Sequence, residues 1–116
     1  MTTKRTVVGA HYGLRDWLAQ RVTAVIMAVY TIVLLVAVLA LPELTYGNWA
    51  GLFASAWMKI ATLLVVIALI YHAWVGVRDI YMDYLPSAAL RLVLQVLTIA
   101  VLIGYACWAA IILWRV

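Results

Sequence analysis

Three long runs of uncharged, mostly apolar residues dominate this chain. The runs cover residues 22–41, 60–77 and 92–114, and a charged residue or a proline closes each of them. About 20 apolar residues are needed to cross the hydrocarbon core of a bilayer, so each run predicts a transmembrane helix. With polar residues allowed at the helix ends, we expect an all-α membrane protein with three transmembrane helices at about 22–41, 58–84 and 90–114.

Prolines and turn formers predict where these helices are connected. Pro42 and Pro86 follow the first and second runs, and proline cannot continue a helical hydrogen-bond ladder. Residues 42–57 mix turn formers with tryptophans, which predicts a loop at one membrane face, and residues 85–89 form a shorter connection. We find no internal repeat and no linker, so we expect residues 1–116 to form a single transmembrane domain that begins with a polar segment, 1–21.

The distribution of basic residues predicts the topology. The chain is 70% hydrophobic and only 10% charged, which leaves no room for a soluble domain. Its net charge of +4 reflects basic residues beside the spans, which is typical of topology signals and lipid contact rather than of nucleic-acid binding. Six of them fall on one predicted side (Lys4, Arg5, Arg15, Arg21, Arg78 and Arg91) and two on the other (Lys59 and Arg115).

We therefore expect residues 1–21 and 85–89 to be cytoplasmic, with the 42–57 loop and the C-terminus outside. The first run is longer than the apolar region of a signal peptide, and no Arg-rich amphipathic leader precedes it. The expected location is a bacterial inner membrane, or a membrane reached by an already processed chain.

His72 is the one histidine inside a predicted span, and intramembrane ionisable groups are candidates for function. Ala68 and Gly76 lie one helical turn away on the same face, so a flat macrocycle could approach, and a neutral imidazole is a good ligand for haem iron. Alternatively, the small residues let another helix pack closely while His72 forms a hydrogen bond across the interface. The other histidine, His11, lies outside the spans, so a haem here would need a partner's second ligand.

A second candidate lies where the second span meets the cytoplasmic side. Tyr84 beside Asp83 combines a hydrogen-bond donor with an acid–base group, as a quinone carbonyl requires, and Arg78, Asp79 and Tyr81 lie nearby. The alternative, which spacing alone favours, is an interfacial tyrosine beside a solvated charge cluster. Asp79 and Asp83 would repel each other unless Arg78 or a partner compensates.

Arginines before the first span offer a third candidate role. Arg21 and Arg15 could pair with haem propionates through charge-assisted hydrogen bonds, or could simply anchor the helix at the interface. No nucleotide-binding loop, paired-cysteine metal site or hydrolase triad is present, so the chain is not an enzyme on its own.

Several segments together resemble the hydrophobic membrane-anchor subunits of succinate dehydrogenase, the smaller cytochrome b556 partner. The likeness covers nearly the whole chain and is carried by GLRDWLAQRVTA at 13–24, ELTY at 43–46, FAS at 53–55, HAWVG at 72–76, DY at 83–84 and LRL at 90–92.

The resemblance implies a hetero-oligomeric helix bundle in which His72 is one axial ligand of haem b and a larger anchor subunit supplies the other. It also implies that Tyr84, supported by Asp83, binds ubiquinone near an iron–sulfur subunit, which receives electrons from succinate oxidised in a flavoprotein subunit. Such a complex serves the tricarboxylic acid cycle and aerobic electron transport. Where the family has a histidine before the aspartate, this chain has Arg15.

Other interpretations remain open at this point. The anchor of a fumarate reductase, or of another quinone-linked oxidoreductase, would share these features. A small proton-coupled exporter usually has four spans and an acidic residue in the first, which this chain lacks. A purely structural membrane protein would tolerate the loss of His72 and Tyr84.

Overall fold

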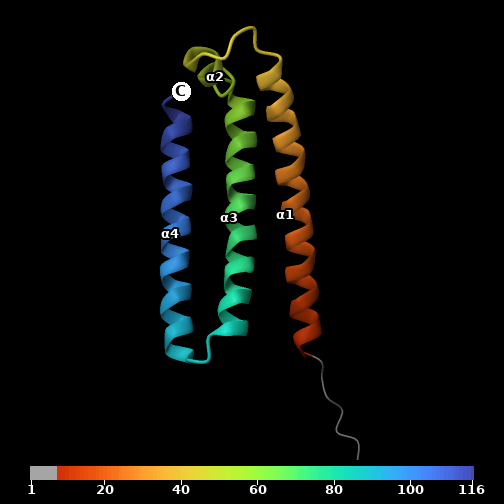
Figure 1. Ribbon diagram of the computed structural model, residues 1–116, viewed down its shortest axis with the longest axis vertical. Helices are drawn as coiled ribbons and strands as arrows, with labels where there is room; N and C mark the ends of the chain where they lie inside the picture. The colour runs from red at the N-terminus through yellow and green to blue at the C-terminus, as the bar shows by residue number, and fades with distance from the viewer. Residues whose placement is uncertain (1–7) are drawn as a thin grey trace, which may run out of the picture.

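Three long helices lie side by side in a row (Figure 1). The computed structural model describes the backbone of residues 8–116 and the side chains of residues 13–116. Its helices are α1 (Val8–Leu39), the short α2 (Tyr46–Gly51), α3 (Ala56–Tyr84) and α4 (Ala88–Trp114). The middle helix, α3, packs against both α1 and α4. The first residues of α1 and the α3–α4 connection lie at one end, whereas α2 and the C-terminus lie at the other.

The three long helices are each long and apolar enough to span a membrane, which confirms the all-α architecture with three spans. Among the described side chains the buried apolar core consists of only three residues, Ala68, Val75 and Leu113. Large apolar side chains are instead exposed along every long helix. A row of helices cannot enclose a core, so lipid or other helices must cover these faces.

Serine and threonine hydroxyl groups cap the N-termini of α2, α3 and α4. Thr45 accepts a hydrogen bond from the Asn48 amide at the start of α2, and Ser55 accepts one from Met58 at the start of α3. Ser87 does the same for α4 through Leu90. These caps satisfy amide groups that have no partner inside the helix, and they fix where each helix begins.

The ends of the predicted helices are close to those observed. α1 ends at Leu39 before Pro42, and α3 ends at Tyr84 before Pro86, as the prolines predicted. α3 and α4 each begin two residues before the predicted starts, directly after their capping serines.

The prediction was wrong for the start of the first helix, which begins at Val8 rather than Val22. Charged residues interrupt an apolar run but do not interrupt a helix, because a helix can continue beyond the hydrocarbon core. Residues 8–21 of the predicted polar segment are therefore helical. The predicted 42–57 loop also contains the helix α2. Lys4 and Arg5, which contributed to the topology count, lie outside the described residues.

Hydrogen bonds between polar side chains join the neighbouring long helices. The Tyr30 hydroxyl group on α1 contacts the Thr62 hydroxyl group on α3. The Tyr81 hydroxyl group on α3 lies 3.0 Å from Thr98 Oγ1 on α4. Because apolar burial gives little driving force in lipid, such contacts help to specify how transmembrane helices pair.

Candidate functional site

His72 lies on the face of α3 that packs against α1. Its Nδ1 is 3.0 Å from the Oγ1 of Thr23, a residue of α1 that is 49 positions away in sequence. Thr23 in turn donates a hydrogen bond of 2.7 Å to the Ala19 carbonyl oxygen in its own helix. The imidazole is therefore connected to the backbone of α1 through a single hydroxyl group.

His72 also lines a polar hollow of about 500 Å³ between α1 and α3. Trp17 and Arg21, which are exposed, form part of its wall, so the hollow opens toward the outside of the chain. The Oε1 atom of Gln20 is buried without a hydrogen-bond partner among the described residues. The complete lining is Gly13, Asp16, Trp17, Gln20, Arg21, His72, Val75 and Asp79.

The small residues around His72 lie mostly under α1 rather than on an open shelf. Ala68 is only 6% exposed. A Cβ atom added to Gly76 would meet the Gln20 side chain of α1 at 3.9 Å. Close helix packing and a hydrogen bond across the interface, which was the alternative interpretation, are thus both present. They leave the hollow beside His72 open, so the ligand interpretation stays a prediction.

The two arginines predicted to contact propionates are placed differently. Arg21 lines the hollow beside His72, and its guanidinium carbon lies 5.4 Å from the centre of the Trp17 ring. Stacking on an indole holds the charged group near the hollow. Arg15 is exposed and is not among the residues that line the hollow. The structure therefore brings Arg21, but not Arg15, to His72.

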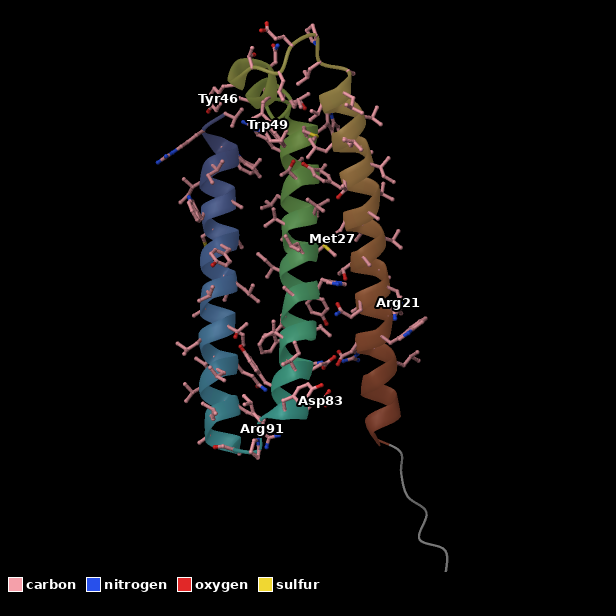
Figure 2. All side chains as sticks on the ribbon, in the orientation of Figure 1. Arg21, Met27, Tyr46, Trp49, Asp83 and Arg91 are labelled. Carbon is pink, nitrogen blue, oxygen red and sulfur yellow. The ribbon has the colours of Figure 1, made fainter. Side chains whose placement is uncertain are left out.

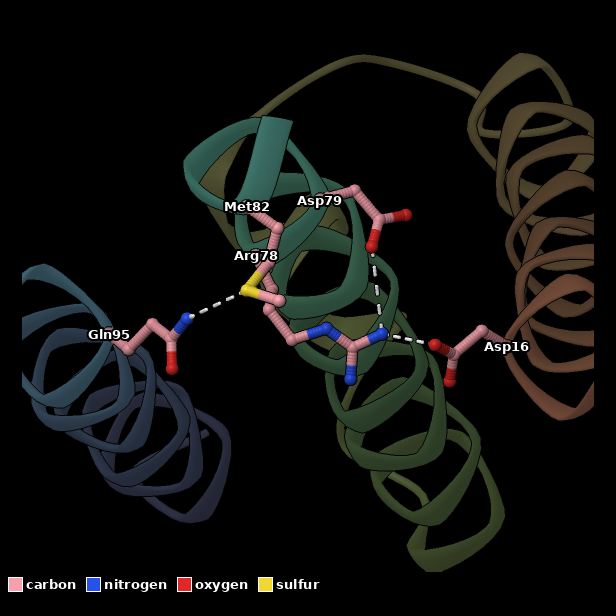
Figure 3. A network of polar contacts seen from close by, with 5 residues as sticks. All are labelled: Asp16, Arg78, Asp79, Met82 and Gln95. Atoms are coloured by element: carbon pink, nitrogen blue, oxygen red, sulfur yellow. Dashed lines mark hydrogen bonds and ion pairs between the residues drawn. The ribbon is translucent and has the colours of Figure 1, made fainter. Parts of the chain in front are cut away.

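An ionic cluster joins α1 and α3 (Figure 3), and two of its carboxylates, Asp16 and Asp79, line the hollow. The Arg78 guanidinium on α3 donates to the Asp16 carboxylate on α1 and lies 3.6 Å from a carboxylate oxygen of Asp79. Arg78 and Asp16 are each about 30% exposed, at 29% and 30%. The positive charge of Arg78 thus compensates the negative charge of Asp79, which was one of the two possibilities that the sequence left open. The ion pair between Arg78 and Asp16 was not predicted.

The predicted quinone cluster divides into parts with different surroundings. Tyr81 contacts Thr98 of α4, and Arg78 and Asp79 face α1. Asp83 and Tyr84 are exposed in the last turn of α3, and Tyr84 is 77% exposed. Figure 2 shows Asp83 at the same end of the molecule as Arg91, opposite Tyr46 and Trp49.

The His72 and Tyr84 positions are well separated along α3. Tyr84 is twelve residues further along the same helix, which at the rise of an α-helix corresponds to about 18 Å. The two candidate sites are therefore distinct places on one rigid element, and a single bound molecule of moderate size would not contact both at once.

Three residues near His72 were missed by sequence reasoning: Asp16, Gln20 and Thr23. They recur at intervals of four and three residues, which places them on one face of α1. This polar stripe was the available signal. It was overlooked because residues 1–21 were interpreted only as a polar segment before the first span, so no helical periodicity was sought there.

The fold defines a multi-pass membrane protein with three long helices that polar side-chain contacts join. The family model for the succinate dehydrogenase/fumarate reductase transmembrane subunit matches residues 1–111. The chain is also 38% identical over 102 residues to a succinate dehydrogenase hydrophobic membrane anchor subunit from Coxiella burnetii (strain RSA 493 / Nine Mile phase I), covering 88% of this chain and 89% of that relative. The chain belongs to this family of transmembrane subunits.

Proposed function

We propose that this chain is the smaller membrane-anchor subunit of a succinate:ubiquinone oxidoreductase and supplies one axial ligand, His72, to haem b. The observation that carries the proposal is the setting of His72. One ring nitrogen is held by Thr23, the other has no recorded partner among the described residues, and the ring lines an open polar hollow. A neutral imidazole in this position is suited to ligate iron.

The residues around the hollow fit haem better than a bare metal ion. No group of three or more His, Cys, Asp or Glu side chains gathers within the described part of the chain, and a porphyrin brings four ligands of its own. His72 would supply the fifth ligand and Arg21 would pair with a propionate. When bound, haem b supplies a one-electron redox centre.

The second axial ligand would come from a larger anchor subunit. His11 lies in the first turns of α1, and its side chain lies outside the described residues. The open side of the hollow and the partnerless Gln20 oxygen both favour completion of the site by another chain. In this proposal the larger anchor packs against α1 and α3, and the iron–sulfur and flavoprotein subunits cover the end that holds Tyr84.

Tyr84 is the proposed hydrogen-bond donor to ubiquinone, with Asp83 supporting it. Both side chains are exposed at the end of α3, where a quinone head group in the membrane could meet protons from water. Neither has a recorded hydrogen bond among the described side chains, so both remain available to a ligand. An anchor subunit of a fumarate reductase has the same requirements, and the direction of electron flow would distinguish it.

The test of the haem assignment is replacement of His72 in the assembled complex. We expect His72→Ala to lower the haem-to-flavin ratio or to change the reduced-minus-oxidised visible spectrum. Tyr71→Phe is the matched control, because Tyr71 is an exposed aromatic residue next to His72 in the same helix. Unchanged haem content and an unchanged spectrum in His72→Ala would remove His72 as a ligand.

The proposed orientation places the N-terminus and the α3–α4 connection in the cytoplasm of a bacterium, with the C-terminus in the periplasm. Arg15, Arg21, Arg78 and Arg91 support this orientation through the excess of positive charge on cytoplasmic sides. After Cys107→Ser, single cysteines at Asn48 and Ala89 can be compared with a membrane-impermeant maleimide. We expect external labelling at 48 and protection at 89, and the reverse pattern would invert the topology.

A further inference from the structure

We infer that Thr23 is a positioning residue that fixes His72 in the tautomer with its proton on Nδ1 and leaves Nε2 to ligate the iron. This inference rests on the proposed function, because it presumes that His72 is a ligand. It adds a specific role for an uncharged side chain of α1, which would not itself contact the iron.

The argument begins with the single proton of the Thr23 hydroxyl group. Oγ1 lies 2.7 Å from the Ala19 carbonyl oxygen, which can only accept a hydrogen bond, and 3.3 Å from the Gln20 carbonyl oxygen. At 2.7 Å two oxygen atoms need a proton between them, so the hydroxyl group donates to Ala19. Its lone pairs then face any further partner.

The second step concerns His72. Its Nδ1 lies 3.0 Å from the same Oγ1. Because the hydroxyl proton is already used, Oγ1 must accept in this contact and Nδ1 must carry the proton. In a neutral imidazole only one nitrogen is protonated, so Nε2 keeps its lone pair. Binding of a metal through Nε2 requires this tautomer.

The contact also orients the ring. Thr23 is on α1 and His72 is on α3, so the hydrogen bond joins two helices and restricts rotation of the imidazole about its Cβ–Cγ bond. Histidine ligands of metals commonly donate their second ring N–H to such a partner, which sets the ring orientation and raises the basicity of the ligating nitrogen. A more basic axial ligand stabilises ferric over ferrous iron, so the Thr23 contact should lower the haem reduction potential.

The decisive experiment measures the haem midpoint potential and the ferric low-spin electron paramagnetic resonance spectrum in the purified complex. Thr23→Val keeps the shape of the side chain and removes the hydroxyl group, whereas Thr23→Ser restores it. Thr31→Val is the matched control, because Thr31 donates the same 2.7 Å hydrogen bond to the carbonyl oxygen four residues earlier in α1 but has no recorded side-chain partner among the described residues.

We expect Thr23→Val to raise the midpoint potential and to broaden or shift the low-spin signal, while Thr23→Ser and Thr31→Val stay near the wild type. A tenfold change in the ferric-to-ferrous preference would correspond to about 59 mV for this one-electron couple. If Thr23 acted only by packing its side chain, Thr23→Val would keep that packing, and a shift in the midpoint potential would not be reversed by Thr23→Ser.

Two results would overturn the inference, and they are distinguishable. If His72→Ala changes the haem signal but Thr23→Val leaves the potential and the spectrum unaltered, the ligand assignment stands and the role of Thr23 is wrong. If His72→Ala leaves the haem signal unaltered, the proposed function itself fails and the inference fails with it. Should Thr23→Val yield little assembled complex, the Thr23→Ala variant gives the same comparison.

Discussion

The two candidate sites on α3 differ in how much of each is built by this chain. The His72 imidazole is held from α1 by Thr23 and lies beside a polar hollow walled by both helices. Twelve residues further on, Tyr84 is 77% exposed and has no recorded hydrogen bond among the described side chains. One site has its orienting contact already in place, whereas the other offers only a donor and a neighbouring carboxylate.

This difference follows from where each residue meets a second helix. α1 crosses α3 alongside His72, and polar residues at intervals of three and four along α1 supply its neighbours. At the end of α3, Tyr81 uses its hydroxyl group to contact Thr98 of α4, whereas Asp83 and Tyr84 are exposed and have no hydrogen bond among the described side chains. If Tyr84 binds quinone as proposed, its orientation must come from other subunits, so the quinone site should depend on assembly more strongly than the His72 site does.

The largest expected effect of a single substitution is on quinone reduction. Tyr84→Phe keeps the ring and deletes the proposed donor, so we expect quinone reductase activity to fall about 100-fold, as for the loss of one preorganised donor to a reacting oxygen. Succinate oxidation with an artificial dye should be unchanged, because it does not use the membrane site. Steady-state assays with both acceptors on the same preparation measure the difference.

Tyr81→Phe is the matched control for this prediction. Tyr81 has the same side chain three residues earlier, but its hydroxyl group is engaged with Thr98. Quinone reduction should be nearly normal in this variant. Equal activity of Tyr84→Phe and the wild type would instead show that the end of α3 is simply an interfacial tyrosine beside solvated charge.

A smaller effect is expected from the carboxylate that accompanies Tyr84. Asp83→Asn keeps the size of the side chain but removes its acid–base function, and we expect about a tenfold loss of quinone reductase activity, typical of a supporting partner. Asp79→Asn is the control, since Asp79 lies beside Arg78 and lines the hollow near His72. If Asp79→Asn lost as much quinone reductase activity as Asp83→Asn, both carboxylates would act only through their negative charge and not through a contact with quinone.

The positions of the three spans could be predicted because one physical requirement dominates them. A segment that crosses lipid must be a long helix without charged side chains. Pro42 and Pro86 prevent α1 and α3 from continuing. The same requirement says nothing about a helix outside the lipid. The start of α1 at Val8 and the short helix α2 were missed for this reason, since the first depends on polar periodicity and the second on a local cap at Thr45.

The side chains that gather at the candidate site were predicted only in part, and the roles proposed for them stay predictions. His72 and Tyr84 stand out because ionisable or hydrogen-bonding groups are conspicuous near a span. Asp16 and Thr23 do not, because their importance depends on which face of α1 meets α3, and that is a property of two helices rather than of either one. The spacing of Ala68, His72 and Gly76 correctly predicted that they lie on one face of α3. Ala68 is buried and Gly76 lies against the Gln20 side chain of α1, so little of that face is open.

The smallest expected effect concerns the ionic contact that holds α1 to α3 near His72. Arg78→Gln removes the charge shared by Asp16 and Asp79, so the two carboxylates lose their compensation. The side chains of Arg78 and Asp16 are each about 30% exposed, at 29% and 30%. We expect a loss of about 1 kcal/mol in the free energy of unfolding, measured by denaturation in mixed micelles.

A double-mutant cycle with Asp16→Asn separates the pair from other effects of either residue, and Arg91→Gln is a control at the same end of the molecule. Loosening α1 should act on the two sites unequally. The haem should be released at a lower temperature in Arg78→Gln, because His72 depends on its contact with α1. Quinone reduction at low temperature should change little, because Tyr84 lies beyond that contact. An equal loss at both sites would contradict the view that α1 supports only the first.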